Sequence, residues 1–196
     1  MSSTTIGSDE EIARIGEAMA ELLAEQEIGA LATLDRRGHP SVSAMHFACD
    51  GLVAYIHTFT QFRKYQDMLR DGRVSYTVWH EPRAGYAGRR EVRGAQVTGH
   101  ATLVENPDEL HTALRVSYEQ FPWLRDHDVY AGFRKARDTG VQAFFRVAPA
   151  EALWHDGRVA MSYRRLVTFD PDSARITAVT TYPPDEPPQA PRTGTS

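Results

Sequence analysis

Three strand-length segments joined by short turns follow one another in the first third of the chain. They read "IGALATLD" at 28–35, "SVSAMHFAC" at 41–49 and "LVAYIHTF" at 52–59. The turn "RRGHP" supplies a glycine that can take positive φ and a proline that can open a strand, and Asp50-Gly51 is a hairpin signal. Connections this short suit antiparallel neighbours. The pattern therefore predicts an antiparallel meander of three strands.

The elements around this meander break any regular alternation of strand and helix. Ser8 and Glu11 have the spacing of a capping box, and apolar residues then recur at helical intervals to about Glu27. Further elements are expected as a helix at 61–70, strands at 73–79 and 91–105, a helix from 106, and a strand or strand pair at 141–154. This order excludes repeated βαβ units. It predicts a mainly β fold with flanking helices, in which six antiparallel strands form a small barrel.

The length of 196 residues suits one domain with a short tail. We expect the domain to cover residues 1–182. The remaining segment, 183–196, reads "PPDEPPQAPRTGTS" and is rich in proline and polar residues. It cannot bury enough apolar area to offset the entropy lost on ordering, so we expect this tail to be disordered.

Charge and cysteine content limit the classes of protein to which the chain can belong. A net charge of -4 argues against a globally basic nucleic-acid binder, although 63–93 holds eight Lys or Arg against four Asp or Glu. The single Cys49 cannot form an internal disulfide, which favours a reducing compartment. The start of the chain lacks a signal-peptide pattern, and no apolar run approaches a membrane span. We therefore expect a cytoplasmic protein without nucleic-acid or membrane partners.

The stretch "HTFTQFRKYQDML" at 57–69 joins the end of a strand to the start of a helix. Thr58 lies at the strand end, and Arg63 and Lys64 fall in the first helical turn, where cations are unfavourable beside the helix dipole. A phosphate accepts charge-assisted hydrogen bonds from Arg, Lys, hydroxyls and the free N–H groups of a helix start. These residues therefore predict a phosphate site. The alternative is that Arg63 and Lys64 are solvated surface charges and that Thr58 merely ends a strand.

Four motifs in order resemble the pyridoxine 5'-phosphate (pyridoxamine 5'-phosphate) oxidase family of FMN-binding split barrels. "LATLDRRGHPSVSAMHF" resembles the opening hairpin of the family, and "YIHTFTQFRKYQDMLRDGRVSYTVWHEP" resembles its strand, Ser-Arg-Lys helix start and Trp-Glu-Pro strand end. "RGAQVTGHATLVE" is similar to the Arg-Gln-Val strand, and "ALWHDGR" to a Phe-Trp-Gln-Gly segment. The resemblance covers Ile28 to Arg165.

This resemblance implies a cofactor site and a homodimer, because the family holds FMN between two subunits. Arg63 and Lys64 match the pair that binds the flavin phosphate, with Thr58 beside them. The other implied cofactor-binding residues are Met45, His46 and Phe47 under the flavin ring, His57 near it, and Gln96, Trp154 and Arg165 reaching it from the second subunit. Arg164 is an equal candidate for the role of Arg165, because "WHDG" carries an extra residue.

The C-terminal part departs from the family pattern in a way that bears on the substrate. Where the oxidase has Arg and His that handle its phosphorylated substrate, "VAMSYRRLV" has Ala160 or Met161 and Tyr163. Phosphorylated pyridoxine is therefore not expected as the substrate. We expect an FMN-dependent oxidoreductase that acts on a small organic substrate, with NADH or NADPH as candidate electron donors and no identified catalytic side chain.

Three alternatives remain open at this stage. A deazaflavin coenzyme has a longer phosphate-linked tail, for which Arg89, Arg90 and Arg93 offer further cations. A non-enzymatic flavin or haem-binding protein is the second, with His46 or His57 as the haem ligand. An empty scaffold is the third.

Other signals are weaker. The eight histidines lack the paired spacings of a zinc site, so no metal is expected. The Gly-rich loop at 83–90 has no Walker spacing, and we expect a surface loop over the pocket with Tyr86 as a candidate lid residue. The aromatic segment 118–133 can either pack under a long connection or form a substrate wall.

Overall fold

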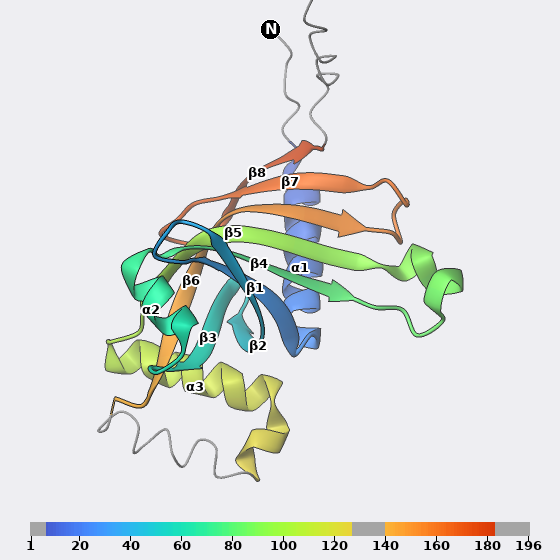
Figure 1. Ribbon diagram of the computed structural model, residues 1–196. Coiled ribbons are helices and arrows are strands. Elements are labelled where there is room, and N and C mark those ends of the chain that lie inside the picture. Colours follow the sequence, from blue (N-terminus) through green and yellow to red (C-terminus); the bar gives the residue numbers. More distant parts are fainter. Residues whose placement is uncertain (1–6, 127–139, 183–196) are drawn as a thin grey trace, which may run out of the picture.

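The computed structural model describes residues 7–126 and 140–182 and shows one antiparallel sheet of eight strands, closed in part into a barrel (Figure 1). The sheet order is β3-β2-β1-β4-β5-β6-β7-β8, and an additional pairing of β3 with β6 closes the first six strands. The strands are β1 (Ile28–Leu34), β2 (Pro40–Asp50), β3 (Val53–Phe59), β4 (Arg73–His80), β5 (Arg93–Leu103), β6 (Gln142–Asp156), β7 (Arg164–Phe169) and β8 (Ile176–Thr181). The predicted six-stranded antiparallel barrel is confirmed. The predicted tail at 183–196 lies outside the described residues.

The long strand β6 takes part in two different pairings along its length. Residues 142–147 pair with β3 and close the barrel, whereas residues 151–155 pair with β7, which continues into β8. Residues 145–149 and 151–156 of β6 also pair with β5. The prediction of a strand or strand pair at 141–154 therefore resolves to a single strand, and β7 and β8 are additions that the sequence did not predict.

Within the described residues, three α-helices flank the barrel. Helix α1 (Asp9–Glu25) begins at Ser8, whose side chain accepts a hydrogen bond from the backbone of Glu11 at 3.2 Å, as the capping box predicts. Helix α2 (Arg63–Arg70) follows β3 directly, and α3 (Pro107–Gln120) is capped by Asn106. The predicted loop after β4 contains the 3₁₀ helix η1 (Gly85–Glu91), and η2 (Pro122–Arg125) follows α3. Within the described ranges, no helix combines the length and apolar character needed to cross a bilayer.

Two apolar clusters hold these elements together. The larger joins the barrel interior to the buried face of α1, and its fully buried members include Ile15, Met19, Leu22, Phe47, Phe145 and Trp154. The smaller lies between α3 and the outer side of β2, β3 and β6, and consists of Ala48, Tyr55, Ala113, Val116, Phe121, Leu124 and Phe144. Because the second cluster includes Phe121 and Leu124, it fixes η2 against the barrel beside β2 and β3.

The pairing of β5 with β6 contains a bulge, with Ala150 of β6 as the extra residue, and this bulge gives a stability prediction. The register with β6 shifts between Thr98 and Gly99, and a Cβ at Gly99 would lie 2.2 Å from the carbonyl oxygen of Ala148. We therefore expect Gly99→Ala to lower the free energy of unfolding by about 1–3 kcal/mol, as overpacking does. Gly94→Ala on the same strand is the control, because its Cβ would make only ordinary contacts of 3.6 Å or more. Urea denaturation compares the two, and equal effects would refute the steric explanation.

Candidate functional site

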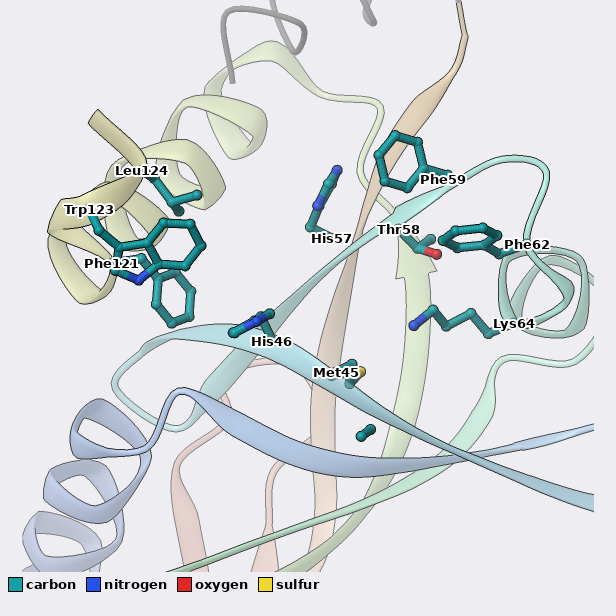
Figure 2. A pocket seen from close by; sticks show the side chains of 11 residues that line it. Met45, His46, His57, Thr58, Phe59, Phe62, Lys64, Phe121, Trp123 and Leu124 are labelled. Atoms are coloured by element: carbon teal, nitrogen blue, oxygen red, sulfur yellow. The ribbon is translucent and has the colours of Figure 1, made fainter. Parts of the chain in front are cut away.

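A cavity of about 250 Å³ lies where β2, β3, the start of α2 and η2 meet (Figure 2). One side is formed by the end of β3 and the first turn of α2, and the opposite side by η2, with β2 between them. The lining residues in the described part of the chain are Ala44, Met45, His46, His57, Thr58, Phe59, Phe62, Lys64, Phe121, Trp123 and Leu124. Five of the sequence-predicted site residues are among them: Met45, His46, His57, Thr58 and Lys64.

Among the described residues that line the cavity, Lys64 is the only one whose side chain carries a full charge at neutral pH by ordinary pKa values. Its side chain runs from α2 toward Met45 and His46 (Figure 2) and is half-buried. Burial lowers the pKa of Lys64 from its usual value. No hydrogen bond or ion pair to another described residue offsets this cost, so an anion bound in the cavity would be stabilised by Lys64 and would stabilise its charged form.

Thr58 adds a hydrogen-bonding group to the same side of the cavity. Its side chain is 2% exposed, and its Oγ1 has no hydrogen-bond partner among the described residues. A buried hydroxyl left in this way costs free energy, which a bound acceptor would recover. Helix α2 has no side-chain cap at Phe62, so its first N–H groups are not satisfied by a capping side chain. Lys64, Thr58 and this helix start form the cationic side of the cavity, and together they suit a phosphate.

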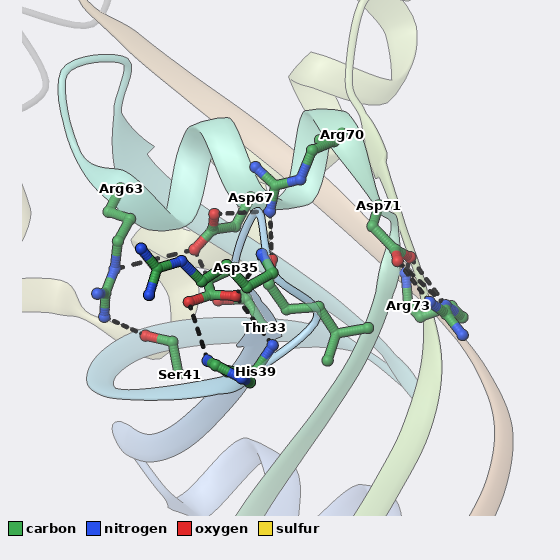
Figure 3. A network of polar contacts seen from close by, with 11 residues as sticks. Thr33, Asp35, His39, Ser41, Arg63, Asp67, Arg70, Asp71 and Arg73 are labelled. Atoms are coloured by element: carbon green, nitrogen blue, oxygen red, sulfur yellow. Dashed lines mark hydrogen bonds and ion pairs between the residues drawn. The ribbon is translucent and has the colours of Figure 1, made fainter.

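Arg63 is on the same helical turn but does not line the cavity. Its Nη2 donates to Ser41 Oγ on β2, its Nε lies 3.9 Å from Asp67 Oδ2, and its side chain is 70% exposed (Figure 3). Asp67 is buried and accepts hydrogen bonds from Thr33 at 3.4 Å and from Arg70 at 2.9 Å. These bonds attach α2 to β1 and thereby position the helix start. The predicted pair of phosphate ligands is therefore split, and a phosphate contact by Arg63 stays a prediction.

His57 lines the cavity as a neutral imidazole. Burial lowers its pKa to about 4, the positive charge of Lys64 acts in the same direction, and the side chain of Gln142 opposes both. At neutral pH the ring therefore carries no charge and adds none to that of Lys64.

The lowered pKa of His57 predicts acid destabilisation. In the unfolded chain the imidazole of His57 binds a proton near pH 6.5, and in the folded chain only near pH 4. The contribution of the neutral ring to the free energy of unfolding is therefore fully present above pH 6.5 and is lost as the pH drops toward 4. Between about pH 7 and pH 5 the expected loss is about 2 kcal/mol, which His57→Gln should remove. Urea denaturation at both pH values measures it. His111→Gln on the exposed side of α3 should keep the full loss, and an unchanged loss in His57→Gln would contradict the assignment.

The wall opposite Lys64 is aromatic. His46 on β2 makes edge contacts with Phe121 and Trp123, with ring centroids 5.6 and 6.0 Å apart, and Leu124 completes this wall. Phe121 and Leu124 pack in the cluster under α3, which confirms the packing alternative for this part of the aromatic segment, and they also line the cavity. A role as a substrate wall stays a prediction, and residues 127–133 of the segment lie outside the described residues. Phe59 and Phe62 also line the cavity, and sequence reasoning missed them. The density of aromatic residues around 59–62 was the available signal.

Besides Arg63, four predicted site residues are absent from the lining: Phe47, Trp154, Arg165 and Gln96. Phe47 points into the barrel beside Tyr76, with ring centroids 6.2 Å apart. Trp154 is 1% exposed in the same core. Arg165 on β7 is held by Glu11 of α1 at 2.9 Å, and the alternative candidate Arg164 contacts His155 Nδ1 at 2.6 Å.

Gln96 is exposed on the outer face of the barrel. The register pairs Gln96 with Thr77, Thr77 with Ala30, and Ala30 with Ala44 at the cavity. Three strand spacings of about 4.8 Å place Gln96 about 14 Å from Ala44, which is beyond the reach of its side chain. Gln96 therefore does not contact the cavity of its own chain.

The loop after β4 does not line the cavity in the described structure. Tyr86 of η1 is 81% exposed, and the guanidinium of Arg89 lies 4.4 Å from the centroid of its ring. A wider groove of about 520 Å³ runs over β1, β4, β5 and β6, and its cation Arg73 is bonded to Asp71 at 2.6 Å. Within residues 7–126 and 140–182, no three His, Cys, Asp or Glu side chains are grouped as metal ligands. The cavity at Lys64 is therefore the stronger candidate site.

Comparison with known structures supports the fold. A haem-binding protein from Mycobacterium smegmatis matches with a TM-score of 0.63 and 16% identity over 79% of this chain, which spans 57% of that protein. A conserved hypothetical protein from Mycobacterium tuberculosis gives 0.57 and 23%, covering 81% of this chain and 90% of that one. A putative pyridoxamine 5'-phosphate oxidase from Listeria innocua gives 0.52 and 14%, covering 70% and 95%. At these identities the likeness shows the architecture alone.

Comparison of the sequence with models of known families identifies the family of this chain. No curated protein matches the chain. The model of the pyridoxamine 5'-phosphate oxidase family, however, matches residues 15–156, which include the barrel strands β1 to β6 and the cavity. This match confirms the resemblance found in the four sequence motifs. The chain belongs to the pyridoxamine 5'-phosphate oxidase family.

Proposed function

We propose that this protein is an FMN-dependent oxidoreductase acting on a small organic substrate, with the flavin phosphate bound by Lys64 and Thr58. The observation that carries the proposal is that a half-buried lysine and a buried hydroxyl, which has no partner among the described residues, share one cavity at a helix start. A dianionic phosphate satisfies all three groups at once. The membership of the chain in a family named for an oxidase supports the same assignment.

The residues of this cavity suit binding and orientation of a cofactor. When bound, FMN supplies two-electron transfer, which no side chain in the cavity can perform alone. Lys64 and Thr58 anchor one end, and His46, Phe121 and Trp123 offer flat surfaces to a planar ring. The neutral His57 leaves Lys64 as the main source of charge, so the site favours one anionic group and an uncharged ring system.

A homodimer is part of the proposal. Ile28, Val42 and Trp79 are exposed on the outer face of β1, β2 and β4, because the buried residues between them point into the barrel. Ala44 and His46 of the cavity and Gln96 lie on this same outer face, as the register shows. A second copy placed over the face would cover both the exposed apolar residues and the cavity mouth. Gln96 would then reach the cofactor of the partner, as its family counterpart does.

The absorption spectrum of the freshly purified protein tests the cofactor, and sedimentation analysis tests the assembly. We expect flavin bands, or their appearance after addition of FMN, together with a dimeric mass. Bleaching of the flavin by NADH or NADPH, followed by reoxidation, would identify the electron donor. Protein that takes up no FMN would contradict the proposed function.

Haem is the second candidate, because two imidazoles, His46 and His57, line the cavity and one similar structure is a haem-binding protein. A Soret band in place of flavin bands would support it. The case for a deazaflavin is weaker, since two of the three additional cations, Arg89 and Arg93, are already engaged. Arg93 is bonded to Glu21 and Glu25, and Arg89 stacks on an exposed tyrosine.

A further inference from the structure

The side chain of Gln120, the last residue of α3, connects segments that are far apart in the sequence. Its Nε2 donates hydrogen bonds to the carbonyl oxygens of Leu23 at 3.0 Å and Gln26 at 2.7 Å, and its Oε1 accepts one from the backbone N–H of Cys49 at 3.1 Å. Two carbonyls require donors and one N–H requires an acceptor, so these partners fix the orientation of the amide. The half-buried Gln120 therefore binds the end of α1 and the strand β2 at the same time.

The backbone groups that Gln120 binds lie where other elements end. The last carbonyls of an α-helix have no partner within the helix, and the last turn of α1 contains no basic residue that could interact with them. Strand β2 pairs with β1 only as far as His46, so β1 offers no partner to the N–H of Cys49. Gln120 thus caps α1 from outside and satisfies β2 beyond the end of its pairing with β1.

Gln120 also lies between the two segments that form one side of the cavity. This side, which we call the aromatic wall, consists of one residue of β2 and three at and after the end of α3: His46, Phe121, Trp123 and Leu124 (Figure 2). Phe121 follows Gln120 directly and is buried, and its ring centroid lies 5.6 Å from that of His46. His46 in turn lies three residues before Cys49 on the strand that Gln120 binds. The bonds of Gln120 therefore fix both parts of the wall relative to each other.

We propose that Gln120 is a positioning residue for the flavin ring, which sets the place of the aromatic wall relative to the phosphate anchor without contacting the cofactor. This inference rests on the proposed function, in which the wall receives the ring. Gln120 is absent from the described lining, and its three bonds go to α1 and β2, whereas Lys64 and Thr58 belong to α2 and β3. Loss of these bonds should therefore disturb the contacts with the ring and leave the contacts with the phosphate in place.

Binding of FMN and of riboflavin, which has the same ring but no phosphate, tests this role. Gln120→Met keeps the length of the side chain and removes its three hydrogen bonds. We expect it to weaken the binding of both flavins by the same factor, about three- to tenfold, which corresponds to about one aromatic contact. The ratio of the two dissociation constants, measured by quenching of flavin fluorescence, should stay as in the wild type. Gln120→Asn, whose amide is one methylene shorter and cannot reach all three partners, should show the same pattern with a smaller loss.

Two controls separate a role at the flavin from a general loss of stability. Gly99→Ala is expected to destabilise the fold at a bulge outside the described lining of the cavity, and it should leave both flavin affinities unchanged. The visible circular dichroism of the bound flavin, recorded at saturating FMN, reports the surroundings of the ring independently of affinity. It should change in Gln120→Met and stay as in the wild type in Gly99→Ala.

The inference is wrong, and the proposed function stands, if Gln120→Met binds both flavins as tightly as the wild type or if Gly99→Ala weakens them equally. It is also wrong if Gln120→Met loses affinity for FMN alone, because Gln120 would then act on the phosphate side. If Gln120→Met does not fold, the same criteria apply to Gln120→Asn. A wild type that binds neither flavin would overturn the proposed function and this inference with it.

Discussion

Replacing Lys64 by Ala should weaken FMN binding by about 10- to 100-fold, the equivalent of about 1.5–3 kcal/mol for a hydrogen bond to a charged group. Lys64 is the cation in the described lining of the cavity, and burial lowers its pKa. Its loss therefore removes the main electrostatic attraction for the phosphate. Titration of FMN with each protein, followed by quenching of flavin fluorescence, gives the two dissociation constants.

Two further variants test whether the loss of FMN affinity is specific to Lys64. Arg36→Ala removes one positive charge from the exposed turn before β2 and should leave FMN affinity within about twofold, since exposed charges at a distance are screened. Arg63→Ala should have a smaller effect than Lys64→Ala, because Arg63 is bonded to Ser41 outside the cavity. If Arg63→Ala lost more FMN affinity than Lys64→Ala, Arg63 and not Lys64 would be the main phosphate ligand.

Replacing Trp154 by Ala should lower the free energy of unfolding by about 3–5 kcal/mol, the usual cost of truncating a large buried aromatic residue. The side chain is 1% exposed and belongs to the main core, and its strand is paired on both sides, at Ala95 and Arg165. The cavity left behind could not collapse easily between two paired strands. Urea denaturation monitored by circular dichroism measures the change.

The family resemblance predicted that Trp154 completes the cofactor pocket. A role in the core and a role at the cofactor lead to different expected results for its variants. Trp154→Phe keeps most of the buried volume and should recover most of the stability. Trp123→Ala, which removes a tryptophan from the half-exposed wall, should cost far less than Trp154→Ala. A Trp154→Ala protein that is as stable as the wild type but has lost FMN would show that Trp154 acts at the cofactor and not in the core.

The sequence was sufficient for the elements whose signals are local. The capping box at Ser8, the hairpin signals after β1 and β2 and the helix start at 106 all predicted what the structure shows. Strands β7 and β8 were missed for two reasons. Arg164 and Arg165 interrupt the apolar alternation at the start of β7, and Glu11, the acidic partner of Arg165, lies more than a hundred residues away. Pairing that depends on distant residues leaves little local signal.

The candidate site was predictable in its location but not in its detail. Neighbouring residues of an α-helix point about 100° apart, so Arg63 and Lys64 cannot both face one cavity in the same way. Which of the two faces it depends on how α2 is attached to β1 through Asp67, a tertiary contact. The aromatic wall depends in turn on the bonds of Gln120 to α1 and β2. Such contacts between distant segments were beyond the reach of local pattern reasoning.

The most direct test of the central claim compares FMN with riboflavin, which lacks the phosphate, in the wild type and in Lys64→Ala. If Lys64 holds the phosphate, the wild type should bind FMN at least about tenfold more tightly than riboflavin, and this preference should largely disappear in the variant. Riboflavin affinity itself should be nearly the same in both proteins. An FMN preference that survives the loss of Lys64, or a wild type that does not distinguish the two flavins, would contradict the assignment of the cavity as a flavin phosphate site.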